Sequence, residues 1–249
     1  MPARVSRLVQ NCQPENLLLD AQGHLILTDF GCAKDASLGQ GEEGDVDVDA
    51  MSATSFTGTE AYMAPEIIEL MMLRDTENQE GAAGTGQAEA GRSYGIAVDW
   101  WAFGVLLHQM LTGDIPFFAN NVKTMRKKIL AAKIKFAKFL SPTSVSLLKQ
   151  LLVADPTSRL GGSRPGGAVR SPGGVAAGAL AVRSHSFFEG VCWDAALDKR
   201  LPPPFVPSLP SGPLDIGNID EKYTRGFAAV DSPVSSPALA ASGLFSGFS

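Results

Sequence analysis

An asparagine and an aspartate at the two ends of a short apolar hairpin are the residues of this sequence best suited to chemistry. Asn16 ends the tripeptide Pro14-Glu15-Asn16 and stands thirteen residues before Asp29, which opens Asp29-Phe30-Gly31. An amide oxygen and a carboxylate held at neighbouring points can share a magnesium ion and a polyphosphate. A lone Asp or Asn would instead be interpreted as an Asx turn at a hairpin end, so the assignment depends on the surrounding motifs.

Two short apolar runs must position that pair. Residues 17–19 and 25–27 are joined by Asp20-Ala21-Gln22-Gly23, a turn sequence whose glycine can take a positive φ. This pattern predicts a small β-hairpin. Because a hairpin brings its two ends together, we expect Asn16 and Asp29 to be neighbours.

Helical segments follow further along the chain. In residues 96–111, 12 of the 16 residues are apolar and cover every face, which predicts a helix surrounded by protein. Residues 123–138 are basic and amphipathic, and we favour a solvated helix and loop there over a partner-docking face. Ser141-Pro142 supplies an N-cap and a first-turn proline for a helix that Asp155-Pro156 ends.

Two segments have compositions that cannot build a core. Residues 75–93 contain no Val, Ile, Leu, Met or aromatic residue, and residues 161–184 contain seven glycines among 24 residues. We expect both to be disordered insertions in a fixed scaffold.

The composition of the 249-residue chain narrows the class of protein. A hydrophobic content of 45% is enough for a buried core, and the net charge of −5 has the wrong sign for binding nucleic acid or anionic lipid. The three cysteines are widely spaced and suggest neither a disulfide scaffold nor a zinc site. No apolar run reaches the ~20 residues of a membrane span, and residues 1–13 do not resemble a signal peptide, so we expect a cytoplasmic or nuclear protein.

Three further motifs follow the hairpin in order, at residues 58–66 (GTEAYMAPE), 96–104 (IAVDWWAFG) and 155–161 (DPTSRLG). In order and spacing they resemble the activation-segment end, the central helix and the late arginine motif of eukaryotic protein kinases. The likeness runs from Pro14 to the C-terminus, apart from the two insertions.

Shorter motifs narrow the resemblance to one group. Residues 99–101 (DWW), 185–188 (HSFF) and the proline-rich 203–207 (PPFVP) resemble the AGC group of serine/threonine kinases. Residues 231–233 (DSP) and 245–249 (FSGFS) look most like its ribosomal-protein-S-six kinase branch.

The resemblance implies a fold class and a domain organisation. We expect a mainly α structure: a protein-kinase-like C-terminal lobe with a small β-hairpin at the catalytic loop, an extended AGC-type tail, and an absent N-terminal lobe. The expected parts are an unrelated segment 1–13, the C-lobe 14–188 and the tail 189–249. No Gly-rich strand turn, which would mark the lobe that closes an ATP pocket, precedes Pro14.

The resemblance also implies roles for individual residues. Asp29 would bind the Mg²⁺ that bridges the ATP phosphates, and Asn16 the second Mg²⁺. Ser55, Ser232 and Ser249 occupy the activation-loop, turn-motif and hydrophobic-motif phosphorylation positions. As bare sequence, each of these serines is an ordinary loop residue.

Four residues would have supporting roles by the same resemblance. Thr59 matches a threonine that steadies the catalytic loop. Glu66 and Arg159 match a buried ion pair under the activation segment. Asp99 matches a helix-start carboxylate that accepts N–H groups from the catalytic loop, although a plain acidic helix start would differ little in physics.

The catalytic loop departs from the family pattern. A histidine or tyrosine, arginine, catalytic aspartate, leucine and lysine precede Pro-Glu-Asn in kinases, whereas this chain has Val9, Gln10, Asn11, Cys12 and Gln13. Asn11 cannot accept the proton of a substrate hydroxyl, and Gln13 cannot offer a cation to the γ-phosphate. Gln10 likewise cannot pair with a phosphate on Ser55.

We therefore expect a truncated and inactive fragment of a protein serine/threonine kinase. Its family uses ATP and Mg²⁺ and acts with protein substrates and upstream activating kinases. The alternative is a non-catalytic, pseudokinase-like module that binds kinases or substrates through the basic segment 123–138 and the tail.

Overall fold

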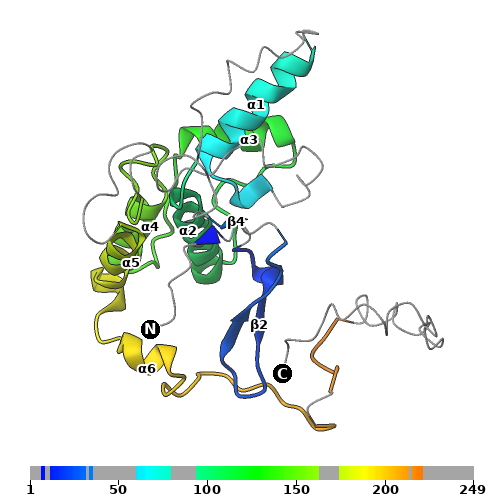
Figure 1. Ribbon diagram of the computed structural model, residues 1–249, viewed down its shortest axis with the longest axis vertical. Helices are drawn as coiled ribbons and strands as arrows, with labels where there is room; N and C mark the ends of the chain where they lie inside the picture. The colour runs from blue at the N-terminus through cyan, green and yellow to red at the C-terminus, as the bar shows by residue number, and fades with distance from the viewer. Residues whose placement is uncertain are drawn as a thin grey trace, which may run out of the picture. The chain divides into compact units, whose positions relative to one another are not determined.

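The computed structural model of the chain consists of short β-strands followed by helices (Figure 1). It describes residues 7–8, 12–31, 34–35, 60–79, 94–162, 174–212 and 215–220. The chain forms two compact units, Met1–Leu18 with Leu25–Leu201, and Leu19–His24 with Pro202–Ser249. In the described part of the chain, no helix combines the length and the apolar character needed to cross a bilayer.

The hairpin predicted from the sequence is present. A 3₁₀ turn, η1 (Pro14–Asn16), leads into β2 (Leu17–Leu19), which pairs with β3 (Leu25–Leu27). In the turn between them, Asp20 Oδ1 accepts hydrogen bonds from the backbone N–H groups of Gln22 and His24 at 3.0 and 2.8 Å. Gly23 has a φ of 87°, as the turn requires.

A second strand pair involves the N-terminal residues. β1 (Arg7–Leu8) lies antiparallel to β4 (Lys34–Asp35), with Arg7 opposite Asp35 and Leu8 opposite Lys34. Backbone pairing of this kind makes residues 7–8 part of the folded chain. This pairing does not test whether segment 1–13 is unrelated to kinases, which stays a prediction.

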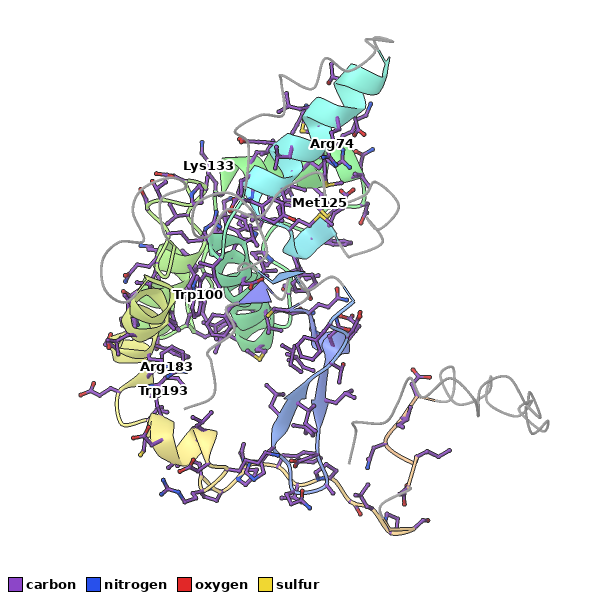
Figure 2. The ribbon with its side chains drawn as sticks, in the orientation of Figure 1. Arg74, Trp100, Met125, Lys133, Arg183 and Trp193 are labelled. Carbon is purple, nitrogen blue, oxygen red and sulfur yellow. The ribbon has the colours of Figure 1, made fainter. Side chains whose placement is uncertain are left out.

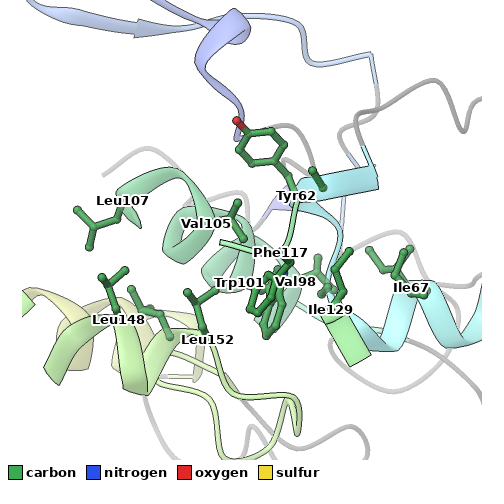
Figure 3. Packing of buried hydrophobic residues seen from close by; sticks show 14 of the residues in the cluster. Tyr62, Ile67, Val98, Trp101, Val105, Leu107, Phe117, Ile129, Leu148 and Leu152 are labelled. Carbon is green, nitrogen blue, oxygen red and sulfur yellow. The ribbon is translucent and has the colours of Figure 1, made fainter. Parts of the chain in front are cut away.

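The core is built around α2 (Ala97–Thr112), the buried helix predicted from its apolar faces. Trp101 is fully buried and stacks on Phe117, with ring centroids 5.2 Å apart and planes 11° from parallel. Figure 3 shows Val98 and Val105 of the same helix in this cluster, with side chains from the surrounding helices.

Three helices pack around this core. They are α1 (Pro65–Gln79), α3 (Val122–Ala131) and α4 (Pro142–Leu151). α4 packs against α2, and α1 lies beside α3 (Figure 1). The predicted start of α4 is confirmed: Ser141 is its N-cap and accepts the N–H of Ser144 at 3.1 Å, with Pro142 in the first turn.

The prediction of disorder is wrong for parts of both supposed insertions. α1 continues to Gln79, and α5 (Gly174–Arg183) forms within the glycine-rich segment; residues 80–93 and 163–173 lie outside the described part. Glycine allows close packing here, since a Cβ on Gly178 would lie 2.5 Å from the Gly161 carbonyl oxygen. Val182 is buried, so α5 contributes to the core despite its composition.

α5 is followed by a turn and a short helix, η4 (Ser186–Phe188) and α6 (Trp193–Leu197). The guanidinium of Arg183 lies over the Trp193 ring at 5.4 Å, and Trp193 Nε1 donates to the Arg183 carbonyl at 3.2 Å (Figure 2).

In the other unit, Asp215 accepts the N–H groups of Ser211 and Gly217, and these hydrogen bonds lower the pKa of its carboxyl group.

Gly113 and Gly161 share a left-handed backbone, but only Gly161 is closely packed, so the two contributions to stability can be measured separately. Gly113 and Gly161 have φ values of 81° and 82°, but a Cβ would meet nothing within 4 Å at Gly113 and would lie 2.5 Å from Trp100 Nε1 at Gly161. We expect Gly113→Ala to lower the free energy of unfolding by about 1 kcal/mol through the left-handed backbone alone. Gly161→Ala should cost about 1–3 kcal/mol more because of overpacking. Urea unfolding measures both, and equal losses would contradict the close packing on Trp100.

Candidate active site

Asn16 and Asp29 lie at neighbouring points because the hairpin ends are hydrogen-bonded together. The backbone N–H and the hydroxyl of Thr28 both donate to the carbonyl oxygen of Asn16, at 2.8 and 3.1 Å. Asn16 is buried, whereas Asp29 is exposed, and Asp29 Oδ1 accepts the N–H of Gly31 at 3.2 Å. Asp29, the residue after Thr28, is thus held beside Asn16, the last residue of η1.

The backbone at Asp29 is unusual. Its φ of 58° lies in the left-handed region, which non-glycine residues rarely adopt. A conformation of this kind costs of order 1–3 kcal/mol and is concentrated at functional sites. The surrounding hairpin supplies the constraint that holds it.

The two side chains fit a magnesium-nucleotide site. Carboxylate and amide oxygens are ligands that Mg²⁺ accepts, and it is commonly bound by one or two such groups together with substrate phosphates. The described residues contain no group of three or more His, Cys, Asp or Glu that could hold a metal ion by themselves. Asn16 and Asp29 therefore suit an ion shared with a polyphosphate better than an ion caged by protein alone.

The segment before Asn16 packs near the start of α2. Burial and the negative charge of Asp99 raise the pKa of the Cys12 thiol to about 11. Asp99, in the first turn of α2, therefore acts electrostatically on the segment that leads to Asn16. The carbonyl of Gln13 accepts the N–H of Asn16 at 3.0 Å, which closes η1.

A tyrosine that the sequence analysis did not single out connects α2 with the end of the activation-segment motif. Tyr62, in η3 (Glu60–Tyr62), is buried, and its hydroxyl donates to Gln109 Oε1 of α2. Burial raises the pKa of Tyr62, and the charge of Glu15 adds to this effect. The position of Tyr62 within residues 58–66 was a signal that could have indicated it.

Glu66 and Arg159 form a bidentate ion pair. Arg159 Nη1 lies 2.8 Å from Glu66 Oε1, and Nη2 lies 2.9 Å from Oε2. The Arg159 side chain is fully buried and also donates to the carbonyls of Ala97, Val153 and Ala154. Its guanidinium lies 5.2 Å from the Trp101 ring. The pair therefore joins the start of α1, the start of α2 and the turn after α4.

A second ion cluster was missed by the sequence analysis. Arg126 of α3 binds Glu60 through both carboxylate oxygens, at 2.7 and 3.1 Å, and reaches Asp75 of α1 at 3.2 Å. Hydrogen bonding to Glu60 is the main cause that raises the pKa of Arg126. Because these partners are 66 and 51 residues away along the chain, local sequence patterns gave no signal for them.

Several residues expected at the site cannot be placed. Asn11, Ser55, Thr59, Ser232 and Ser249 lie outside the described residues.

Comparison with known proteins identifies the family. The sequence model of the protein kinase domain family matches residues 11–164 of this chain. A probable serine/threonine-protein kinase of Dictyostelium discoideum is 37% identical over 243 residues, which is 96% of this chain and 43% of the relative. Human ribosomal protein S6 kinase alpha-4 is 36% identical over 94% of this chain and 25% of its own length. The RAC family serine/threonine-protein kinase homolog of D. discoideum is 34% identical over 87% of this chain and 38% of the relative.

The chain belongs to the protein kinase domain family. More narrowly, its relatives are AGC-group serine/threonine kinases, among them S6 kinases, a RAC-family kinase and the mouse cAMP-dependent protein kinase catalytic subunit PRKX. The chain spans less than half the length of each of these relatives.

The family match corrects the fold class expected from the sequence. It begins at residue 11, inside the segment 1–13 that was predicted to be unrelated, and β1 within that segment pairs with β4. The predicted C-terminal lobe with an absent N-terminal lobe is therefore wrong. The supported fold is a protein kinase domain with an N-terminal β-strand pair and following helices.

The buried ion pair generates a stability prediction. Glu66→Gln would leave the Arg159 guanidinium buried without a counter-charge, and we expect the free energy of unfolding to fall by about 3–5 kcal/mol. Arg200→Ala is the control, because Arg200 pairs with Asp198 at 2.9 Å with both side chains more than half exposed, so its loss should cost about 0–1 kcal/mol. Guanidinium chloride unfolding measures both variants, and similar losses would refute a dominant role for the buried pair.

Proposed function

We propose that this chain is part of a protein serine/threonine kinase and that Asn16 and Asp29 hold Mg²⁺-ATP. The observation that carries the proposal is the hairpin that fixes Asp29 at a φ of 58° beside the buried Asn16, within the kinase-domain match. Bound magnesium would neutralise charge on the phosphates of ATP. The chain's own contribution is to hold the two oxygen ligands in place before the nucleotide arrives.

The residues before Asn16 favour a site that binds nucleotide better than it turns it over. By family resemblance Asn11 stands at the position of the catalytic base and Gln13 at that of the phosphate-binding lysine. An amide at either position offers neither the proton acceptor nor the cation. We infer that phosphoryl transfer to protein Ser or Thr is strongly impaired in this chain.

An alternative is a non-catalytic module of the same fold. The same two substitutions favour it, since a module that only binds partners needs no catalytic base. It differs from the first proposal in that Mg²⁺-ATP is not required, so nucleotide binding discriminates between the two.

Nucleotide binding tests the role of Asp29. Titration of the chain with a fluorescent ATP analogue should show binding that depends on Mg²⁺. Asp29→Asn should weaken it by about tenfold or more, because a neutral amide is a poorer magnesium ligand than a carboxylate. Asp20→Asn is the matched control: it makes the same chemical change in the same hairpin, and an asparagine can still accept the turn N–H groups. Absence of Mg²⁺-dependent binding, or equal binding by all three proteins, would favour the non-catalytic module.

Restoring the family residues tests the inferred impairment. The double variant Asn11→Asp/Gln13→Lys should transfer phosphate to a degenerate Ser/Thr peptide library about 10²-fold faster or more, in line with the usual contribution of a general base. Incorporation of labelled phosphate measures the rate, and Mg²⁺-ATP binding should change much less. A wild-type rate as high as that of the variant would show that the present residues do not impair transfer.

A further inference from the structure

Residues 203–205 of the tail lie against the turn of the β2–β3 hairpin (Figure 1). A Cβ atom on Gly23 would lie 2.1 Å from the carbonyl oxygen of Phe205 and 3.0 Å from the Cβ of Pro203. The two backbones can approach this closely only because residue 23 has no side chain. The turn, Leu19–His24, and the tail from Pro202 onward also form one compact unit. We call the packing of residues 203–205 on Gly23 the tail contact.

The hairpin has little buried surface of its own. β2 and β3 contain three residues each. Four of these six apolar side chains are exposed: Leu18, Leu19, Leu25 and Ile26. A two-stranded hairpin is at best marginally stable in water unless it packs against another part of the protein. A contact at the turn is therefore expected to contribute to the order of both strands.

The tail is suited to give that support because it is stiff. Pro202, Pro203 and Pro204 are consecutive, and their rings fix three successive φ angles. Pro203 is partly buried, whereas its two neighbours are exposed. A segment with few accessible conformations loses little entropy when it packs on a surface. It can therefore hold the turn through a small number of contacts.

Hydrogen bonds connect the turn with the candidate magnesium site. At the turn, the backbone N–H of Asp20 donates to the carbonyl of His24 at 2.8 Å. At the other end of the same two strands, Thr28 donates to the carbonyl of Asn16, and Asp29 follows. If the turn loosened, the strands would separate more often, and Asn16 and Asp29 would lose their fixed spacing.

We propose that the tail contact positions Asn16 and Asp29, because residues 203–205 hold the β2–β3 hairpin in the form that binds Mg²⁺-ATP. Gly23 and Pro203 are then positioning residues, which act through the hairpin and not on the nucleotide itself. The proposal rests on the proposed function, since it concerns the same pair of magnesium ligands. It adds that a segment about 180 residues away in the sequence contributes to their geometry.

Hydrogen exchange of the hairpin amides and Mg²⁺-ATP affinity, both measured on the full chain, test the proposal. Pro203→Gly should raise the exchange rates of residues 16–28 about fivefold or more, because it removes the partly buried ring and loosens the tail. It should also weaken Mg²⁺-ATP binding about threefold or more. Pro210→Gly is the matched control, since Pro210 is an exposed proline of the same tail. Both variants gain the same unfolded-state entropy, but the control should change each quantity by less than about twofold.

A double variant separates the tail contact from strain within the turn. Gly23→Ala places a Cβ against Phe205, but it also places alanine at a φ of 87°. It should therefore raise hairpin exchange by itself. If Gly23 and Pro203 belong to one contact, Gly23→Ala/Pro203→Gly should raise exchange by less than the product of the two single effects.

Three results would overturn the proposal. The first is equal hairpin exchange in Pro203→Gly and Pro210→Gly, and the second is a double variant whose fold-change equals the product of the single ones. The third is faster exchange in Pro203→Gly with unchanged Mg²⁺-ATP affinity, which would remove the positioning role. Absence of Mg²⁺-ATP binding by the unmodified chain would instead contradict the proposed function, and the exchange rates would still decide whether the tail holds the hairpin.

Discussion

The buried guanidinium of Arg159 is the constraint on which the rest of this domain depends. A charge removed from water must be paired and fully hydrogen-bonded, or the folded state loses several kcal/mol. Arg159 meets that requirement with Glu66 and three backbone carbonyls drawn from different segments of the chain. Satisfying one side chain therefore fixes the starts of α1 and α2 and the turn after α4 relative to one another.

The segment that leads to the candidate site lies near α2, one of the elements that this pair holds. The Ala97 carbonyl that accepts from Arg159 opens α2, and Asp99, two residues later, acts electrostatically on Cys12 before η1. Tyr62 precedes Glu66 and donates to Gln109 further along α2. Within the hairpin, the hydrogen bonds from Thr28 to Asn16 hold the backbone that leads into Asp29. Long-range packing positions the site, and local bonding completes it.

Sequence reasoning succeeded where structure is decided locally. The hairpin turn, the apolar faces of α2 and the Ser141 cap depend on residues a few positions apart, and all three are present. It failed where distant residues decide. β1 forms by pairing with β4, which is distant in the sequence. The glycine content of α5 predicted disorder, although Gly178 packs closely on Gly161. The orientation of Asp29 required the hydrogen bonds of Thr28, which no spacing rule supplies.

Arg126 and Arg159 both tie separate elements of the domain together through carboxylates. Arg126 faces Glu60 and Asp75 and, like Arg159, ties separate elements together, although it does so nearer the surface. Once those carboxylates are bound, they cannot also neutralise Lys123 and Lys127. Exposed lysines without partners do little for stability, since even paired surface charges contribute only about 0–1 kcal/mol. The attachment of α3 to the domain therefore depends on Arg126 and on the buried Met125 and Ile129 rather than on Lys123 and Lys127.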